Sequence, residues 1–84
     1  MNISKEIQKE KIDKVRINNY IKMRLGINKA NKEFCLVKER VSILLFAKKW
    51  DDIPVYKLKE NFNLIDESID VMLESRAIKQ INRF

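Results

Sequence analysis

The scarcity of turn-forming residues limits the fold more than any other feature of this sequence. The 84 residues include one glycine, Gly26, and one proline, Pro54. Sandwiches and barrels of many strands need frequent tight turns, and these two residue types supply most of them. The sequence therefore predicts a mainly α-helical fold.

The length of the chain predicts a single domain, residues 1–84, with a thin core. A chain of this size buries only ~60% of the surface that it exposes when unfolded. We therefore expect a partner or a second copy of the chain to add to the core, which makes a homodimer one expectation. Within the domain we distinguish a basic N-terminal segment, 1–30, from a core, 31–84.

The clearest helical pattern covers residues 30–50. Its apolar positions advance in steps of three and four residues, which places them on one helical face. These positions are Phe34, Val37, Val41 and Leu44. Asn28 or Asn31 can cap the start of this helix. Cys35 and Trp50 are both expected in the core.

Two interpretations stay open for residues 15–27, which follow a predicted helix over residues 3–14. Alternating apolar and polar residues favour two strands with a hairpin turn at Asn18 and Asn19. Alternatively, the helix continues and Gly26 ends it. We favour the helix because an isolated hairpin is only marginally stable in water.

Short elements are predicted near the only proline. Pro54 suits the first turn of a helix. One face of that helix is formed by Val55, Leu58 and Phe62. Asn63 tolerates the left-handed conformation that ends many helices, and Asp66 is expected to cap a second helix. Ile78 and Ile81 are separated by two polar residues, which favours a short closing strand.

Residues 53–81 resemble a helix-turn-helix unit, and with the preceding helix they resemble the winged-helix class. Counted from Asn63, the buried positions of the family pattern fall on Leu58, Phe62, Leu64, Ile69 and Met72. The stretch 77–81 stands where a wing strand would follow. The resemblance implies a mainly α fold, a small helix-turn-helix or winged-helix-like domain with or without a short β-hairpin. It makes 31–84 a helix-turn-helix-like core whose second motif helix reads the major groove.

Two features depart from this pattern. Lys59 stands where the family has a small residue on the first motif helix. The second motif helix carries acids, namely Asp66, Glu67, Asp70 and Glu74. Carboxylates near phosphates weaken binding, because affinity comes from lysine and arginine releasing counterions. The acids favour an alternative function, a protein-binding inhibitor or adaptor that uses this helix.

Positive charge is concentrated in the first part of the chain. Residues 1–50 carry a net charge of +8 and residues 51–84 carry −2, within a total of +6. This balance predicts a small basic nucleic-acid-binding regulator, with DNA expected before RNA because no RNA-binding motif accompanies the tyrosines. The candidate contacts are Lys22, Arg24, Lys29, Lys32, Lys57, Lys79 and Arg83.

The residues of enzyme chemistry are scarce. The chain has no histidine, and one cysteine cannot build a structural zinc site. Gly26 alone cannot form a glycine-rich phosphate loop. The acidic pairs at 51–52 and 66–67 fit helix caps better than catalysis. We therefore expect no enzymatic activity, no metal and no cofactor.

The sequence also predicts a cytoplasmic protein without a membrane segment. The longest apolar run, 43–47, is far shorter than the ~20 residues that span a bilayer, and no signal-peptide core follows Met1. With one cysteine there is no internal disulfide. Abundant isoleucine, lysine and asparagine are typical of AT-rich genomes, which suggests a low-GC bacterium, one of its phages or a mobile element as the source.

Overall fold

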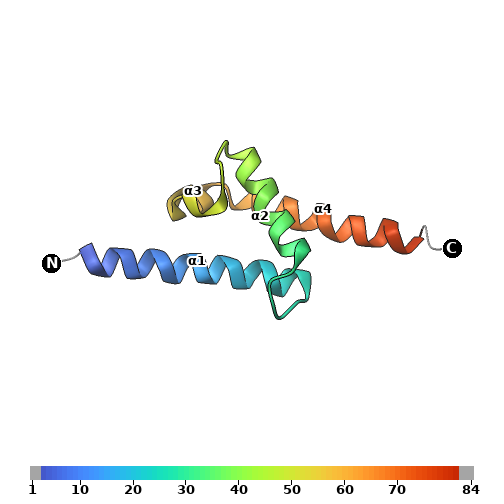
Figure 1. Cartoon of the computed structure of the whole chain (residues 1–84), viewed down its shortest axis with the longest axis horizontal. Coiled ribbons are helices and arrows are strands. Elements are labelled where there is room, and N and C mark those ends of the chain that lie inside the picture. The colour runs from blue at the N-terminus through green and yellow to red at the C-terminus, as the bar shows by residue number, and fades with distance from the viewer. Residues whose placement is uncertain (1–2, 82–84) are drawn as a thin grey trace.

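The structure, a computed structural model, describes the backbone of residues 3–81 and the side chains of residues 9–79 (Figure 1). Its helices are α1 (Ile3–Leu25), α2 (Lys32–Leu44), α3 (Val55–Glu60) and α4 (Phe62–Ile81), and a 3-10 turn, η1 (Trp50–Asp52), precedes α3. No strand occurs between residues 3 and 81. The prediction of a mainly helical fold is therefore confirmed.

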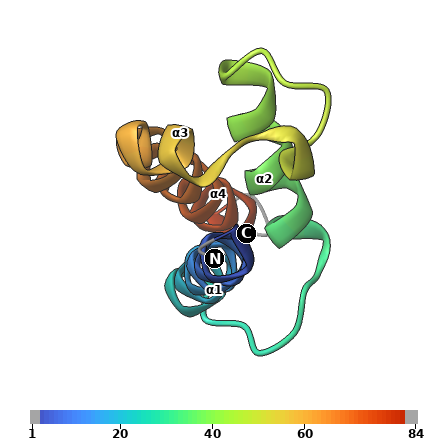
Figure 2. The same ribbon diagram turned by 90° about the vertical axis from the view of Figure 1, so that its left-hand side faces the viewer.

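Helices α1 and α4 run side by side along the long axis, and α2 packs across both of them (Figure 1, Figure 2). Helix α3 contacts α1 and the helix that follows it. The molecule measures 61 × 27 × 18 Å, and its radius of gyration is 14.6 Å. A compact domain of this length would have a radius of gyration of ~12 Å. The elongated shape leaves wide faces of the long helices without partners.

The core is built from apolar residues that recur every three or four positions. In α1 the buried side chains are four residues apart, so they form one stripe on the helix. The core consists of Ile17, Ile21, Leu25, Phe34, Val37, Val41, Trp50, Ile53, Leu58, Ile65 and Ile69. The prediction for Trp50 is confirmed. The prediction for Cys35 is wrong, because this residue is rotated by about 100° from the buried Phe34 and is exposed.

Helices α1 and α2 end in the same way. In each, the residue after the last turn has a positive φ, +70° at Gly26 and +58° at Phe46. The following amides of Ile27 and Ala47 donate to carbonyl oxygens five residues back, at 3.0 and 2.9 Å, which is the Schellman arrangement. The prediction of a helix ending at Gly26 is thus confirmed, and the hairpin interpretation of 15–27 is wrong.

Helix α2 begins as predicted and ends earlier than predicted. The backbone N–H of Phe34 donates to the Asn31 side chain at 2.9 Å, which makes Asn31 the N-cap. The helix stops at Leu44 instead of reaching residue 50, because Phe46 adopts a conformation that a right-handed helix cannot continue through. The turn that follows allows Trp50 to return to the core.

The junction of α3 and α4 lies two residues before the predicted turn. Asn61 ends α3, and its side-chain amide donates to the Lys57 carbonyl at 2.9 Å. Asn63 and Asp66 therefore lie inside α4, and their predicted roles as turn and N-cap are wrong. The closing strand is also wrong, because α4 continues to Ile81 without a residue that breaks it.

The burial predicted from the helix-turn-helix pattern is partly met. Leu58 and Ile69 are fully buried, while Phe62, Leu64 and Met72 are half-buried. The earlier start of α4 explains the difference. It turns Ile65, rather than Leu64, into the core.

Candidate nucleic-acid interface

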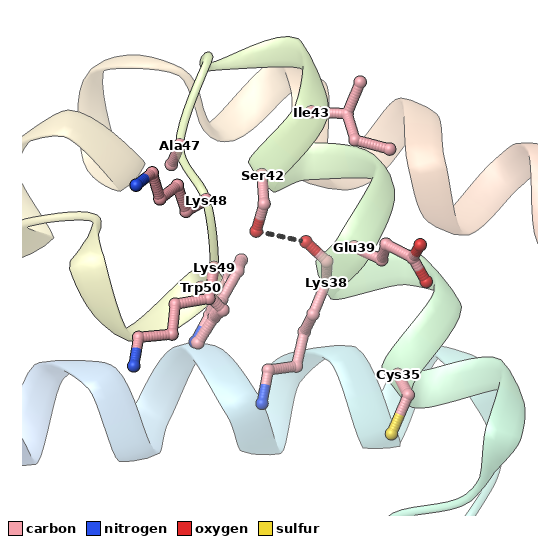
Figure 3. Close-up of a pocket in the computed structure, with 9 residues that line it drawn as sticks. All are labelled: Cys35, Lys38, Glu39, Ser42, Ile43, Ala47, Lys48, Lys49 and Trp50. Atoms are coloured by element: carbon pink, nitrogen blue, oxygen red, sulfur yellow. Dashed lines mark hydrogen bonds between the residues drawn. The ribbon is translucent and has the colours of Figure 1, made fainter.

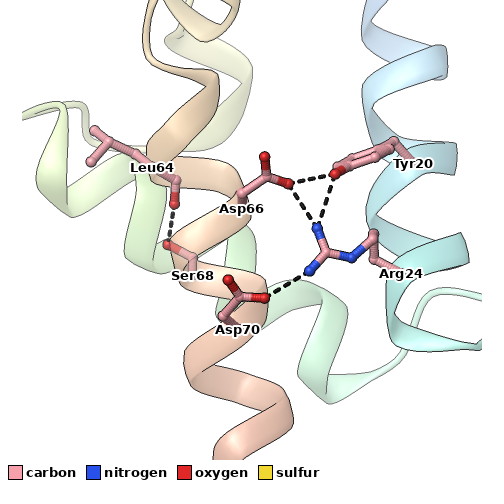
Figure 4. A network of polar contacts seen from close by, with 6 residues as sticks. All are labelled: Tyr20, Arg24, Leu64, Asp66, Ser68 and Asp70. Atoms are coloured by element: carbon pink, nitrogen blue, oxygen red, sulfur yellow. Dashed lines mark hydrogen bonds and ion pairs between the residues drawn. The ribbon is translucent and has the colours of Figure 1, made fainter.

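Arg24 joins α1 to α4 through two acids (Figure 4). Its guanidinium contacts Asp66 at 2.8 Å and Asp70 at 2.7 Å, and it also donates to the Tyr20 hydroxyl at 2.9 Å. Tyr20 in turn donates to Asp66 and packs on the Phe62 ring with centroids 5.0 Å apart. The Tyr20 hydroxyl, followed by Asp70, raises the pKa of Arg24. The structure therefore brings together residues that the sequence assigned to two rival interfaces.

The other arginines with described side chains are also paired with acids. Arg40 lies 3.5 Å from Glu67, and Arg16 lies 4.0 Å from Asp13. Arg76 forms a forked ion pair with Glu33, with Nε 2.8 Å from one carboxylate oxygen, and donates to the Leu25 carbonyl at 2.9 Å.

Because these arginines are paired with acids, other cations are more available to bind a ligand. The hydrogen bond from Arg76 lowers the pKa of Glu33, and the one from Lys59 lowers the pKa of Asp13. Among residues 9–79, every arginine lies within 4.0 Å of an acid of the same chain, although the Arg16 side chain remains 78% exposed. The positive charge without an acidic partner is carried by lysines.

Five lysines gather on the side of the molecule where α1, α2 and the loop before η1 meet. The Lys38 ammonium lies 4.8 Å from the centre of the Phe34 ring and 5.6 Å from that of Trp50. Lys22 lies 5.4 Å from the same Phe34 ring. We call these five residues the lysine face: Lys14, Lys22, Lys38, Lys48 and Lys49.

Lys14 contacts η1, and Lys48 and Lys49 line a surface hollow together with Lys38. The hollow has a volume of about 390 Å³, and Lys38, Lys48 and Lys49 line it beside Trp50 (Figure 3). Lys14 donates to the backbone carbonyl of Asp51, within η1, at 3.2 Å. Glu39 is the one carboxylate in the lining of the hollow.

The lysine face suits phosphate better than bases. Phe34 and Trp50 are 5% and 6% exposed, so their rings support the lysine stems and do not present a surface for base stacking. Lysine ammonium groups bind phosphate as point charges without the forked geometry that reads guanine. The arrangement can hold a polyanionic backbone and offers little for sequence readout.

The sequence-predicted contacts are spread over the molecule. Lys22 belongs to the lysine face, while Lys29 lies exposed between α1 and α2 and Lys32 begins α2. Lys57 on α3 and Lys79 near the end of α4 are both exposed, and that end of α4 points away from α3 (Figure 1). Arg83 lies outside the described residues. In the alternative set, Glu67 pairs with Arg40 and Glu74 is exposed.

Four members of the lysine face were not predicted from the sequence: Lys14, Lys38, Lys48 and Lys49. A signal existed for part of this set. Lys38 is four residues after Phe34, which places both on one side of a helix, and Lys48 and Lys49 directly precede Trp50. The folding of the loop back onto α2, which brings them together, has no such local signal.

Comparison with protein-family models, curated proteins and solved structures finds no match to the chain. Within the described part of the chain, no group of three or more potential metal ligands occurs. No helix over that part combines the length and apolar character that crossing a membrane requires.

Proposed function

We propose that this protein binds nucleic acid, double-stranded DNA in the first place, by holding the phosphate backbone with the lysine face. One observation carries the proposal: the described arginines are paired with acids, while five lysines from α1, α2 and the following loop gather without acidic partners. Phosphate contacts by lysine and arginine supply most of the affinity of sequence-independent DNA binding. The same set gives little selectivity among bases.

The helix order supports a helix-turn-helix type of scaffold for this regulator. A short α3 is followed by a longer α4, as in that motif, and α2 packs on α4. The connection differs from the motif, since Asn61 alone joins the helices where three or four residues are usual. The acids Asp66 and Asp70 of α4 are held by Arg24, so we place DNA on the lysine face and not on α4.

The alternative, a protein-binding adaptor that uses the acids of α4, receives less support. Three of its four acids pair with arginines of the same chain, and only Glu74 has no ion pair among the described side chains. A basic partner would have to displace Arg24 and Arg40.

Two triple variants of equal charge test the proposal. One replaces three members of the lysine face by glutamine, Lys38→Gln, Lys48→Gln and Lys49→Gln. The control replaces exposed lysines elsewhere, Lys29→Gln, Lys32→Gln and Lys57→Gln. Both reduce the net charge from +6 to +3, so their long-range attraction for DNA is similar.

Fluorescence anisotropy with a labelled DNA duplex at low salt measures the result. We expect the first variant to lose at least about tenfold in affinity and the control to lose much less, because contacts at short range outweigh net charge. Two duplexes of unrelated sequence should bind the wild type equally. Equal losses in the two variants, or no binding by the wild type, would refute the proposal.

A further inference from the structure

Two apolar surfaces of the described chain have no partner within it. The first lies on the outer side of α1, where Ile12, Val15 and Met23 are 52%, 54% and 67% exposed. The buried residues Ile17 and Ile21 occupy the opposite side of this helix. We call these three exposed residues the α1 stripe.

The second surface is a groove between α2 and α4 with a volume of about 470 Å³. It is lined by Leu36, Glu39, Arg40, Ile43, Leu44 and Met72. Ile43 is 65% exposed, and Leu36 and Leu44 are each 40% exposed. Apolar surface gathered in one hollow is typical of a docking site, whereas single exposed apolar residues are common.

The two surfaces carry opposite charge. Residues 9–16 contain four cationic and two acidic residues, a net charge of +2. Both acids contact α3 on the side of α1 away from the stripe, since Glu10 accepts from the Val55 amide and Asp13 binds Lys59 at 3.0 Å. The outer edges of the α1 stripe are therefore cationic. The groove holds Glu39, and its one cation, Arg40, is paired with Glu67, which leaves the groove with a net charge of −1.

We propose that the α1 stripe of one copy docks into the α2–α4 groove of a second copy. Contact between two α1 stripes would oppose cationic edges, and contact between two grooves would oppose carboxylates, so only the unlike pairing is attractive. Lys11 precedes Val15 by one helical turn and Arg16 follows Ile12 by one turn. These cations flank the stripe, where they would meet Glu39, the carboxylate that lines the groove.

The dimensions of the two surfaces agree. At 1.5 Å per residue, the α1 stripe extends ~16 Å from Ile12 to Met23, and the groove follows α2 for ~12 Å from Leu36 to Leu44. A helix in a groove of this kind buries its outer apolar face, and the core gains the area that an 84-residue chain lacks.

The pairing is heterologous, because the two contacting surfaces differ. Each copy keeps one free stripe or groove after the first contact, so assembly continues into a ring or a chain of copies. The groove adjoins the lysine face on α2, where Glu39 and Ile43 line both hollows, and assembly would repeat the lysine face along one polyanion. The inference stands apart from the proposed function, since association needs no nucleic acid.

Two single variants and their mixture test this pairing in nucleic-acid-free buffer. Val15→Glu places a carboxylate in the stripe, and Ile43→Glu places one in the groove. Both side chains are more than half exposed, so the fold should persist, which far-UV circular dichroism verifies. Tyr56→Glu is the control, because Tyr56 is 65% exposed on α3, outside both surfaces.

Light scattering after size-exclusion chromatography gives the mass of each sample. We expect wild type and Tyr56→Glu to show a mass that rises with concentration, and each stripe or groove variant to remain at the mass of one chain. An equimolar mixture of Val15→Glu and Ile43→Glu should form a complex of two chains, since one retains a groove and the other a stripe. A monomeric wild type, or a mixture that does not associate, would overturn the inference.

Vesicle binding distinguishes a stripe that docks into a second copy from a stripe that binds a membrane. Cosedimentation with anionic vesicles is measured for the wild type and Val15→Glu. We expect no difference between them. A wild type that is monomeric in solution, together with vesicle binding that Val15→Glu abolishes, would assign the stripe to a lipid surface and overturn the pairing.

Discussion

Replacing Phe46 tests the explanation given for the end of α2, because Phe46 occupies a position that usually holds glycine. Its φ is +58° and its side chain is 97% exposed. A non-glycine residue in this left-handed region costs ~1–2 kcal/mol. Glycine removes that strain but loses ~0.5–1 kcal/mol more backbone entropy on folding. Because the exposed ring adds nothing to the core, Phe46→Gly should stabilise the protein by ~0.5–1 kcal/mol.

Urea unfolding followed by circular dichroism measures this change. With a slope of ~1.5 kcal/mol per molar urea, the midpoint should rise by ~0.5 M. Gly26→Ala is the matched control, since φ at Gly26 is +70° and an added methyl group would meet no atom within 4 Å. It should lower the free energy of unfolding by ~1 kcal/mol through the backbone alone. A lower midpoint for Phe46→Gly would refute this explanation of the α2 end.

Three further predictions follow from buried and paired side chains. Ile21 is fully buried, so Ile21→Ala should lower the free energy of unfolding by ~2–5 kcal/mol in the same urea assay. Because Arg76 lowers the pKa of Glu33 from its usual 4.5, the pair stabilises the fold above that value and the stabilisation is lost as pH falls through the lowered pKa. Acid unfolding should show this loss, and Glu33→Gln should show a shallower one. Arg24→Gln should reduce stability but change DNA affinity by less than about twofold in anisotropy, since Asp66 and Asp70 already pair with the guanidinium.

The helices were largely predictable because their signals are local. The shortage of glycine and proline predicted a mainly helical chain, Gly26 predicted the end of α1, and Asn31 was one of two predicted caps for α2. The end of α2 was not predictable, because phenylalanine rarely takes the left-handed conformation of Phe46. The start of α4 was misplaced because Asn61 and Asn63 are equally plausible turn residues in the sequence.

The candidate site was less predictable than the fold, because it depends on which charges pair across the chain. Arg24 and Asp66 are 42 residues apart in sequence, and Arg76 and Glu33 are 43 apart. Sequence shows the sign of each charge but not its partner. The basic and acidic parts of the chain thus suggested two separate interfaces, whereas folding joins Arg24 to the acids of α4 and leaves lysines for a ligand.

The salt dependence of DNA affinity tests the central claim most directly. Each phosphate neutralised contributes about −0.9 to the slope of log affinity against log salt. The five members of the lysine face should therefore give a slope of about −4.5, the lysine-face triple variant about −2, and the control triple variant about −4.5. The same slope in both triple variants would contradict the assignment of the lysine face as the nucleic-acid interface.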